Sequence, residues 1–200
     1  MGHYDASGAL GHDVSARAAR REPFAPIRAI EDDAAATVSV IVDTPKGSRN
    51  KYKYDETLGL YKLAHVLPVG ASFPYNFGFI PGTLAEDGDP LDVLVLMDDA
   101  AFVGCLVPSR LIGVIQAKQT EKKRTFRNDR LIAVAAESHD HHDVRSLDEI
   151  GDNLIREIEH FFVSYNTMRG RRFEPTGRAG PARALALVRD GLVEQPERRS

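Results

Sequence analysis

Short apolar runs with an alternating pattern, separated by turn residues, restrict most strongly how this chain can fold. In the first run, 37–43, Val38, Val40 and Val42 fall on one face, and a period of two is typical of a half-buried strand. Gly and Pro separate further expected strands at 51–54, 60–66, 92–97, 111–118 and 130–136. Short strands at this spacing predict a small closed antiparallel β-barrel with OB-like character and about five strands.

The C-terminal part of the chain has the spacing of helices instead. Between 152 and 168 apolar side chains recur every three or four residues, namely Leu154, Ile155, Ile158, Phe161, Phe162 and Tyr165. This stripe predicts one amphipathic helix. Pro181 suits the first turn of a second helix and Gly191 suits its end. The expected fold class is therefore α+β, a small barrel flanked by two C-terminal helices.

Length and composition favour a single folded unit. The 200 residues, 42% hydrophobic and 28% charged, are enough for one domain with one core. We expect that domain at 34–192. Residues 1–33 are rich in Ala, Gly, Arg and Asp without sustained periodicity and are predicted to be a mobile extension, and 193–200 form a polar tail.

Charge, cysteine usage and the length of apolar runs exclude several classes of protein. The net charge of −3 provides no overall positive field for nucleic acid. The single cysteine, Cys105, cannot form an intramolecular disulfide, and no apolar run approaches membrane-spanning length. The start of the chain lacks the pattern of a secretory signal. We therefore expect a cytoplasmic protein with neither a nucleic-acid partner nor a membrane partner.

Three carboxylates lie close together just before one of the expected strands. Asp87 and Asp89 end the segment 68–89, which is long and aromatic for a loop, and long loops tend to be functional. Asp92 begins the expected strand 92–97. Like charges this close repel, and a divalent cation such as Mg²⁺, which takes oxygen ligands from one or two carboxylates, is the simplest stabilising partner. Because Asp-Gly and Asp-Pro are also ordinary turn dipeptides, a solvated hairpin turn is the alternative interpretation.

This segment closely resembles a known family. The sequence from 73 reads Phe-Pro-Tyr-Asn-Phe-Gly-Phe-Ile-Pro-Gly-Thr-Leu, and Asp-Gly-Asp-Pro-Leu-Asp-Val follows from 87. It resembles the signature region of the soluble, single-domain, Mg²⁺-dependent inorganic pyrophosphatases, and the likeness extends over roughly 37–190. The resemblance implies hydrolysis of inorganic pyrophosphate to two phosphates, with Mg²⁺ as cofactor, Mn²⁺ as its substitute, and assembly as a homo-oligomer.

The resemblance also implies roles for individual carboxylates. Asp87 and Asp92 would ligate Mg²⁺, with Asp92 between two ions, and Asp43 stands where the family usually has a glutamate. Asp89 would accept a proton from the water that attacks phosphorus. A metal pair suits this chemistry because it neutralises the substrate and lowers the pKa of bound water.

The matching cations and tyrosine would hold the phosphates. Lys51 matches a phosphate-binding lysine, Arg130 replaces a lysine, and Tyr165 matches a tyrosine of the family's helix. Groups of this kind stabilise the charge that develops on a transferred phosphoryl group. Taken one at a time, however, a solvated lysine or a half-buried tyrosine is the commoner situation in proteins.

Several positions depart from the family's pattern. Gln119 and Asn128 stand where it has metal-binding aspartates, and the neighbouring carboxylates that could substitute are Glu121 and Asp129. Further departures are His65 for an arginine, Asn166 for a lysine, Phe73 and Phe77 for tyrosines, and Lys53 for an acidic residue. Fewer charged ligands predict weaker Mg²⁺ binding.

The departures leave alternatives open for function. A loop rich in positive charge follows Glu121, and either it replaces part of the metal's charge or it is a solvated basic face; its members are Lys122, Lys123, Arg124 and Arg127. The alternative to pyrophosphate hydrolysis is a catalytically weakened protein of the same fold that binds a phosphorylated ligand or partner. A third alternative is an enzyme that acts on a different phosphoanhydride.

Overall fold

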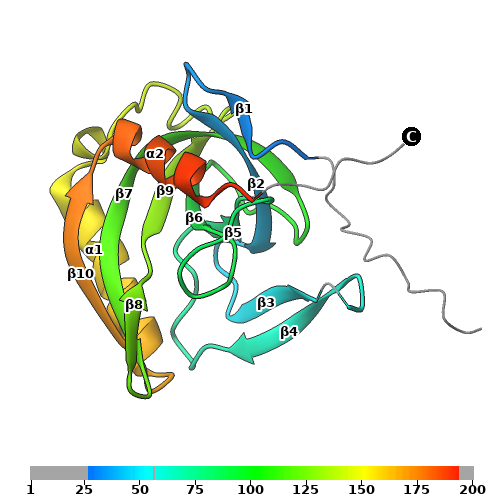
Figure 1. Cartoon of the computed structure of the whole chain (residues 1–200), viewed down its shortest axis with the longest axis vertical. Helices are drawn as coiled ribbons and strands as arrows, with labels where there is room; N and C mark the ends of the chain where they lie inside the picture. Colours follow the sequence, from blue (N-terminus) through cyan, green and yellow to red (C-terminus); the bar gives the residue numbers. More distant parts are fainter. Residues whose placement is uncertain (1–26, 56, 194–200) are drawn as a thin grey trace, which may run out of the picture.

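The computed structural model describes residues 27–55 and 57–193, and these residues form ten strands, two α-helices and one short 3₁₀ helix, η1 (Figure 1). In chain order the elements are β1 (Ile30–Asp32), β2 (Thr37–Thr44), β3 (Asn50–Asp55), β4 (Leu60–Val66), β5 (Asn76–Phe79), β6 (Asp92–Leu96), β7 (Leu106–Glu121), β8 (Arg124–Arg127), β9 (Arg130–Ala135), η1 (Leu147–Ile150), α1 (Asp152–Thr167), β10 (Arg172–Ala179) and α2 (Pro181–Gly191).

Five strands are linked in a ring of pairings. The order β2–β5–β6–β9–β7 returns to β2 because β7 also pairs with β2, where Val40 lies opposite Val107. β1 extends the sheet beside β2, and β10 and β8 both pair with β7. The molecule is thus mostly sheet with two helices, as the sequence predicts at this coarser level.

Two clusters of apolar side chains cover opposite faces of the sheet. β6 shows this best, since Val93 and Val95 belong to the cluster that includes α2, while Leu94 and Leu96 belong to the cluster that includes α1. A strand buried on both faces is expected to be continuously apolar rather than alternating. This explains the unbroken run after Asp92, and it fixes Asp92 at the end of a rigid strand.

One pairing in the ring is parallel, so the prediction that every neighbour is antiparallel is wrong. β6 and β9 run in the same direction, with Val93 opposite Leu131. The chain between them passes through the long strand β7 and the β7–β8 hairpin, and it returns to β9 in the direction of β6. Such a crossover can join parallel neighbours, which a tight turn cannot do.

The aromatic segment that the sequence suggests as a long loop contains the strand β5. This strand pairs with β2 on one side and β6 on the other. Gly78 permits the close approach, because a Cβ atom there would lie 2.1 Å from the carbonyl oxygen of Ile41. β10, which follows α1, was also not predicted, since its sequence contains Pro175 and Gly177 and lacks a regular alternation.

A separate two-stranded hairpin, β3–β4, projects beside the main sheet (Figure 1). In its register Lys51 lies opposite His65, and Lys53 lies opposite Lys62. The hairpin therefore carries cationic side chains that come from sequence segments far from the carboxylates.

The boundary expected at residue 34 falls within the turn between β1 and β2, so part of the predicted extension belongs to the sheet. Ala29 is buried, and Ile30 lies opposite Val38. The remainder of that extension, 1–26, and 194–200 of the expected polar tail lie outside the described residues. No helix within 27–55 and 57–193 has the length and apolar content needed to span a bilayer.

Candidate active site

Asp87 and Asp89 lie on a tight turn directly before β6. Gly88 has a φ of 87°, which glycine adopts readily, and the amide of Asp89 donates to the carboxylate of Asp87 at 3.1 Å. Asp92 is the first residue of β6. Burial, followed by the charges of Asp92 and Asp89, raises the pKa of Asp87 above its usual value. The three carboxylates predicted from the sequence therefore share one electrostatic environment.

Asp92 forms an ion pair with Arg130, the first residue of β9, at 2.8 Å. The parallel register of β6 and β9 brings these two residues to the same end of the sheet. Arg130 is only 4% exposed, and its guanidinium lies 5.1 Å from the ring centroid of Phe162 and 5.3 Å from that of Phe173. Aromatic faces stabilise a cation held in this way. Arg130 is therefore a fixed positive charge at the candidate site.

The two amide residues that replace aspartates form a buried hydrogen-bond chain with Arg130. The Asn128 side chain donates to Gln119 Oε1 at 3.0 Å, and its oxygen accepts a hydrogen bond from Arg130. Both amides are buried. This series of side-chain contacts runs from Gln119 through Asn128 and Arg130 to Asp92. It places neutral and positive groups beside the carboxylates.

Glu121 and Asp129, the carboxylates that could stand in for the missing aspartates, have other partners. Glu121 pairs with Arg171 at 3.0 Å. Asp129 accepts from the amide of Ala117 at 3.1 Å and from Arg127 at 2.6 Å. These contacts connect β7 to β8 and to the residue before β10, and both carboxylates are engaged in ion pairs with arginines.

Asp43 and Lys51 form a second ion pair, within electrostatic range of Asp92. Lys51 donates to both carboxylate oxygens of Asp43, at 2.5 and 2.6 Å, and its ammonium lies 4.3 Å from the ring centroid of Phe77. Burial raises the pKa of Asp43 despite the opposing effect of Lys51, and the charge of Asp92 acts in the same direction as burial. Phe77, which replaces a tyrosine of the resembled family, therefore forms one wall around Lys51.

His65 and Tyr165 connect the hairpin to helix α1. His65 Nε2 lies 2.5 Å from the Tyr165 hydroxyl, which also accepts from Arg169 at 3.1 Å. Burial and then the charges of Arg169, Lys51 and Arg171 lower the pKa of His65 to about 4. Burial raises the pKa of Tyr165. A neutral imidazole and a neutral phenol thus lie among several cations.

Asp89 lies at the exposed edge of the site. It pairs with Lys53 of the β3–β4 hairpin at 2.6 Å, and both side chains are about half exposed. Asn166 points elsewhere, since it is buried and donates to the carbonyl oxygen of Phe162 at 2.9 Å. The structure therefore brings together the sequence-predicted residues and excludes Asn166 from the site.

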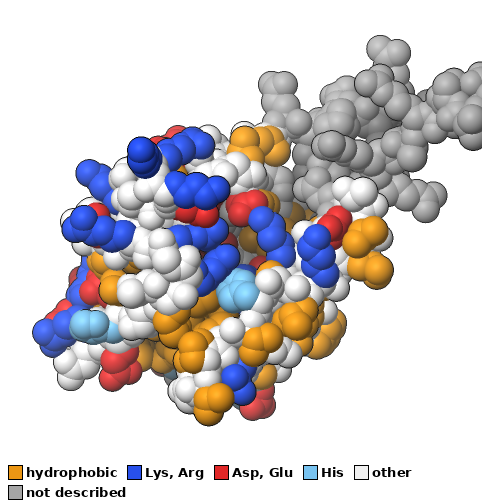
Figure 2. Space-filling view, turned by 90° about the horizontal axis from the view of Figure 1, so that it is seen from below, with side chains coloured by type: hydrophobic (Ala, Val, Ile, Leu, Met, Phe, Trp, Pro, Cys, Tyr) orange, Lys and Arg blue, Asp and Glu red, His pale blue; other side chains and the backbone are white. Residues whose placement is uncertain are grey.

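Two arginines that the sequence interpretation missed also contribute to this region. Arg169 follows Tyr165 by one helical turn, with its guanidinium 5.4 Å from the ring centroid of Tyr165, and Arg171 lies just before β10. The signal available in the sequence is the placement of Arg169 four residues after Tyr165, because residues at this spacing lie close together at the end of a helix, and Arg169 follows the last residue of α1 by two positions. Figure 2 shows Lys and Arg side chains gathered around acidic ones on the same face of the molecule.

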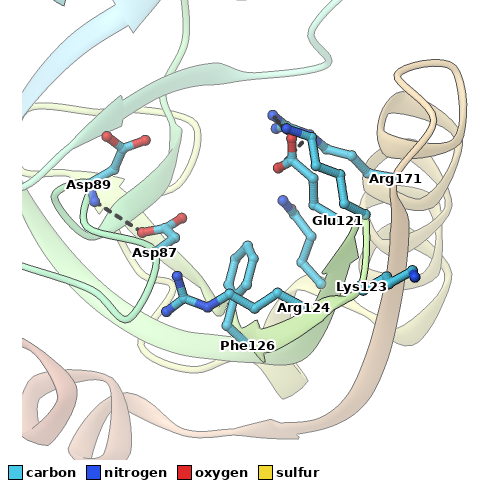
Figure 3. Close-up of a pocket in the computed structure, with 9 residues that line it drawn as sticks. Asp87, Asp89, Glu121, Lys123, Arg124, Phe126 and Arg171 are labelled. Carbon is cyan, nitrogen blue, oxygen red and sulfur yellow. Dashed lines mark hydrogen bonds and ion pairs between the residues drawn. The ribbon is translucent and has the colours of Figure 1, made fainter.

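A hollow of about 600 Å³ adjoins Asp87 and Asp89. Figure 3 shows these two residues on one side and side chains of the β7–β8 hairpin, together with Arg171, on the other. Its lining includes Gln119, Arg124 and Arg171. The hollow is large enough for a small ligand.

Asp87 and Asp92 suit a divalent cation. Burial and then the charge of Asp92 raise the pKa of Asp87, and Arg130 opposes this effect only in part, so a divalent cation bound beside the two carboxylates would favour their ionised forms. Mg²⁺ uses one or two carboxylates together with water and substrate phosphates. Within 27–55 and 57–193, no group of three or more His, Cys, Asp or Glu side chains is arranged to hold a metal. The fit to Mg²⁺ thus rests on the electrostatic coupling of these two residues.

Comparison with known proteins gives a consistent result. Residues 40–194 match the family model described as inorganic pyrophosphatase. The inorganic pyrophosphatase of Geobacillus stearothermophilus is 33% identical over 81% of this chain and 96% of its own length, and that of Corynebacterium efficiens is 37% identical over 78% and 96%.

Solved structures of similar proteins have the same arrangement of elements. The crystal structure of inorganic pyrophosphatase from Thermus thermophilus matches with a TM-score of 0.75 and 34% identity, over 82% of this chain and 93% of that one. An inorganic pyrophosphatase from Neisseria gonorrhoeae matches with a TM-score of 0.75 and 26% identity, over 84% and 96%.

Proposed function

This chain belongs to the inorganic pyrophosphatase family, and we propose the residues with which it hydrolyses inorganic pyrophosphate to two phosphates. The observation that carries the assignment is the contact between Asp92 and Arg130 at 2.8 Å, within electrostatic range of Asp87, Asp43 and Tyr165. It supports a site in which carboxylates, cations and a phenol act on one anionic substrate.

Asp87 and Asp92 are the residues that would hold Mg²⁺ or its substitute Mn²⁺. Bound Mg²⁺ would neutralise charge on pyrophosphate and lower the pKa of a coordinated water. Asp43 is a third candidate ligand, but both of its oxygens accept hydrogen bonds from Lys51. We therefore assign to Asp43 first the role of holding Lys51 and second that of adding negative charge near Asp92.

Asp89 is the residue we propose to accept the proton of the attacking water. Its carboxylate is exposed, and Lys53 contacts one oxygen at 2.6 Å, which leaves the second oxygen for a water molecule. A base must lie within hydrogen-bond reach of the proton that it removes, and the turn before β6 holds Asp89 next to Asp87.

Lys51, Arg130 and Tyr165 would hold the phosphates, and Arg169 adds charge through its contact with Tyr165. Lys51 and Arg130 are held over aromatic rings, so their charges need little rearrangement when substrate binds. Cations oriented in advance stabilise the charge that develops in phosphoryl transfer.

The scaffold we propose is one domain, 34–192 together with β1, built on a closed OB-like barrel. The ring of pairings from β2 through β5, β6, β9 and β7 back to β2 supports this assignment. We also propose that the protein acts in the cytoplasm as a homo-oligomer, in line with the single cysteine and the family.

Release of phosphate from Mg²⁺-pyrophosphate by the purified full chain tests the function. The assay is run beside Asp87→Asn and, as matched control, Asp148→Asn, which removes an exposed carboxylate on η1. We expect phosphate release by the wild type, a loss of Mg²⁺ affinity measured by calorimetry in Asp87→Asn, and no change in Asp148→Asn. Unchanged Mg²⁺ binding by a folded Asp87→Asn protein would contradict the ligand assignment.

The Gln119–Asn128 pair favours a second candidate, a site with little turnover that mainly binds a phosphorylated ligand. The two amides carry no charge, and Asn128 is bonded to Arg130, so the site is less negative than one with two aspartates. Calorimetric titration with pyrophosphate distinguishes the candidates. Tight binding without phosphate release supports the second, and release supports the first.

A further inference from the structure

The hollow beside Asp87 has a positive wall that hydrolysis of pyrophosphate does not explain. This wall is the β7–β8 hairpin, in which Glu121 lies opposite Arg124 and the turn consists of Lys122 and Lys123. Glu121 is paired with Arg171. Among the described residues, no carboxylate lies within ion-pairing distance of Lys122, Lys123 or Arg124. These three residues line the hollow, and none of them has an ion-pair partner among the described residues.

The hairpin holds these cations in a defined arrangement. The hydroxyl groups of Thr120 and Thr125 lie 2.8 Å apart across the two strands. Lys122 has a φ of 56°, a conformation that costs a non-glycine residue about 1 kcal/mol or more and that is enriched at functional sites. Lys122 therefore lies at the tight turn of the hairpin in a conformation that Gly or Asn adopts more readily.

Arg124 points into the hollow, whereas the side-chain end of its neighbour Lys123 extends away from it (Figure 3). The Arg124 guanidinium lies 5.7 Å from the ring centroid of Phe126 and extends toward Asp87, with no ion pair between the two. The space that separates them is therefore bordered by Asp87 on the catalytic side and by a guanidinium on the other.

We propose that this hollow binds the trailing phosphates of a linear inorganic polyphosphate with three or more phosphates, while its terminal phosphate lies at the catalytic carboxylates. The proposal rests on the proposed function of the site. A guanidinium recognises phosphate oxygens with two parallel hydrogen bonds, and Arg124 and Arg171 both line the hollow. The only aromatic ring in this lining, Phe126, already has Arg124 over its ring, so the lining favours phosphate groups over a nucleotide base.

The reaction on this substrate class uses the same chemistry. The terminal P–O–P bond of tripolyphosphate breaks, and a new P–O bond forms to the oxygen of one water molecule, which yields pyrophosphate and phosphate. One proton of the water passes to Asp89 and then to solvent, and the other stays on the phosphate. No oxidant, reductant or further reactant is needed.

The test compares sodium tripolyphosphate with pyrophosphate as substrates of wild type, Arg124→Gln and Arg172→Gln. Arg172→Gln is the matched control, because it removes an exposed guanidinium of β10 that pairs with Glu174 and does not line the hollow. We expect Arg124→Gln to lower kcat/KM for tripolyphosphate about tenfold, the scale of one lost charge-assisted contact, and that for pyrophosphate less than about twofold. Arg172→Gln should change both by less than about twofold.

Each outcome decides for or against the proposal. Equal losses on both substrates in Arg124→Gln, or turnover of pyrophosphate without turnover of tripolyphosphate, would overturn it and leave the proposed function standing. Adenosine triphosphate that is hydrolysed as fast as tripolyphosphate, with the same loss in Arg124→Gln, would overturn the restriction to inorganic chains.

If neither tripolyphosphate nor pyrophosphate is hydrolysed, the proposed function fails. Ligand affinity then tests whether the hollow binds inorganic polyphosphate. Calorimetric titration with sodium tripolyphosphate should then show tighter binding than pyrophosphate, weakened about tenfold in Arg124→Gln. The inference would be overturned if wild type bound tripolyphosphate and pyrophosphate equally tightly. It would also be overturned if wild type and Arg124→Gln bound tripolyphosphate equally tightly.

Discussion

The two sides of the candidate site are built differently. The barrel side consists of Asp43, Asp92 and Arg130, on strands β2, β6 and β9, which are paired on both edges. The hairpin side consists of Asp89 with Lys53 of β3–β4 and Arg124 of β7–β8, all of which are exposed. The difference indicates that charges that must not move are placed on strands within the main sheet, and charges that meet substrate from solvent are placed on a turn and on exposed hairpins.

Loss of one partner of an ion pair is therefore expected to cost more free energy on the barrel side than on the hairpin side. On the barrel side, losing one partner leaves a buried charge or amide without its hydrogen bonds. On the hairpin side, water replaces a lost partner, and the cost is small. The predictions below test this contrast, from the largest expected effect to the smallest.

Asp92→Asn should have the largest effect. It removes the carboxylate nearest to Arg130 and one of the two candidate Mg²⁺ ligands, and we expect turnover of pyrophosphate to fall about a thousandfold. Steady-state phosphate release measures the loss, and circular dichroism checks the fold. A folded variant that keeps a tenth of the wild-type turnover would show that the barrel side does not carry the chemistry.

Asp89→Asn should reduce turnover about a hundredfold, the usual scale for loss of a general base. Stability should change little, because Asp89 is exposed and its contact with Lys53 lies at the surface. Phosphate release and urea unfolding are measured together. Full activity in the folded variant would assign the proton transfer to another group.

Restoring the charged residues of the family pattern should raise activity only when the phosphate-binding position 65 and the metal-ligand positions 119 and 128 are changed together. His65→Arg adds a phosphate-binding group, and Gln119→Asp with Asn128→Asp adds ligands for the metal. We expect the combined variant to exceed the product of the separate effects on kcat/KM, by about tenfold. If the effects of His65→Arg and of Gln119→Asp with Asn128→Asp on kcat/KM simply multiplied, the phosphate-binding group and the metal ligands would act independently.

The same aspartates should make folding depend on Mg²⁺. Because Gln119 and Asn128 share a buried hydrogen bond at 3.0 Å, two carboxylates in their place would repel each other. The melting temperature of Gln119→Asp with Asn128→Asp should fall below that of wild type in chelator and recover on addition of Mg²⁺. Recovery should be absent in Gln119→Asn, which retains a neutral amide.

His65 should make stability depend on pH. Its pKa in the folded protein is lowered to about 4 from the ordinary 6.5, so the unfolded chain binds the proton more readily. The contribution is fully present above pH 6.5 and is lost as the pH falls toward 4. We expect about 1 kcal/mol after solvent screening, because the side chain is partly exposed.

Urea unfolding at pH 7 and pH 4.5 measures this contribution of His65 to the free energy of unfolding. His65→Gln should reduce the difference between the two pH values, while His160→Gln, at an exposed position on α1, should leave it unchanged. Equal pH dependence in all three proteins would mean that the His65 imidazole is not held in its neutral form.

Lys53→Gln should have the smallest effect. The pair with Asp89 is about half exposed on both sides, and exposed pairs contribute no more than about 1 kcal/mol and weaken in salt. The free energy of unfolding should change by less than about 0.5 kcal/mol. A larger change would show that the hairpin side is held more firmly than its exposure indicates.

Much of this protein follows from local sequence patterns. α1 and α2 were predicted close to their observed bounds, because apolar spacing and Pro181 act over a few residues. The grouping of Asp87, Asp89 and Asp92 was equally local, since a short turn keeps neighbours in sequence close in space. β5 escaped prediction because a strand of only four residues that contains Gly78 shows too little of a period.

The sequence by itself determined which residues carry charge at the site and where the two helices and the strands β2, β4, β6 and β9 lie, but it did not determine β5 or β10. Tertiary structure alone decided the partners: Arg130 for Asp92 through the parallel β6–β9 register, Lys51 for Asp43 through the hairpin, and Tyr165 for His65 across 100 residues. The physical reason is that side-chain periodicity is a local property, whereas the choice of neighbouring strand depends on burying the apolar faces of the whole sheet at once.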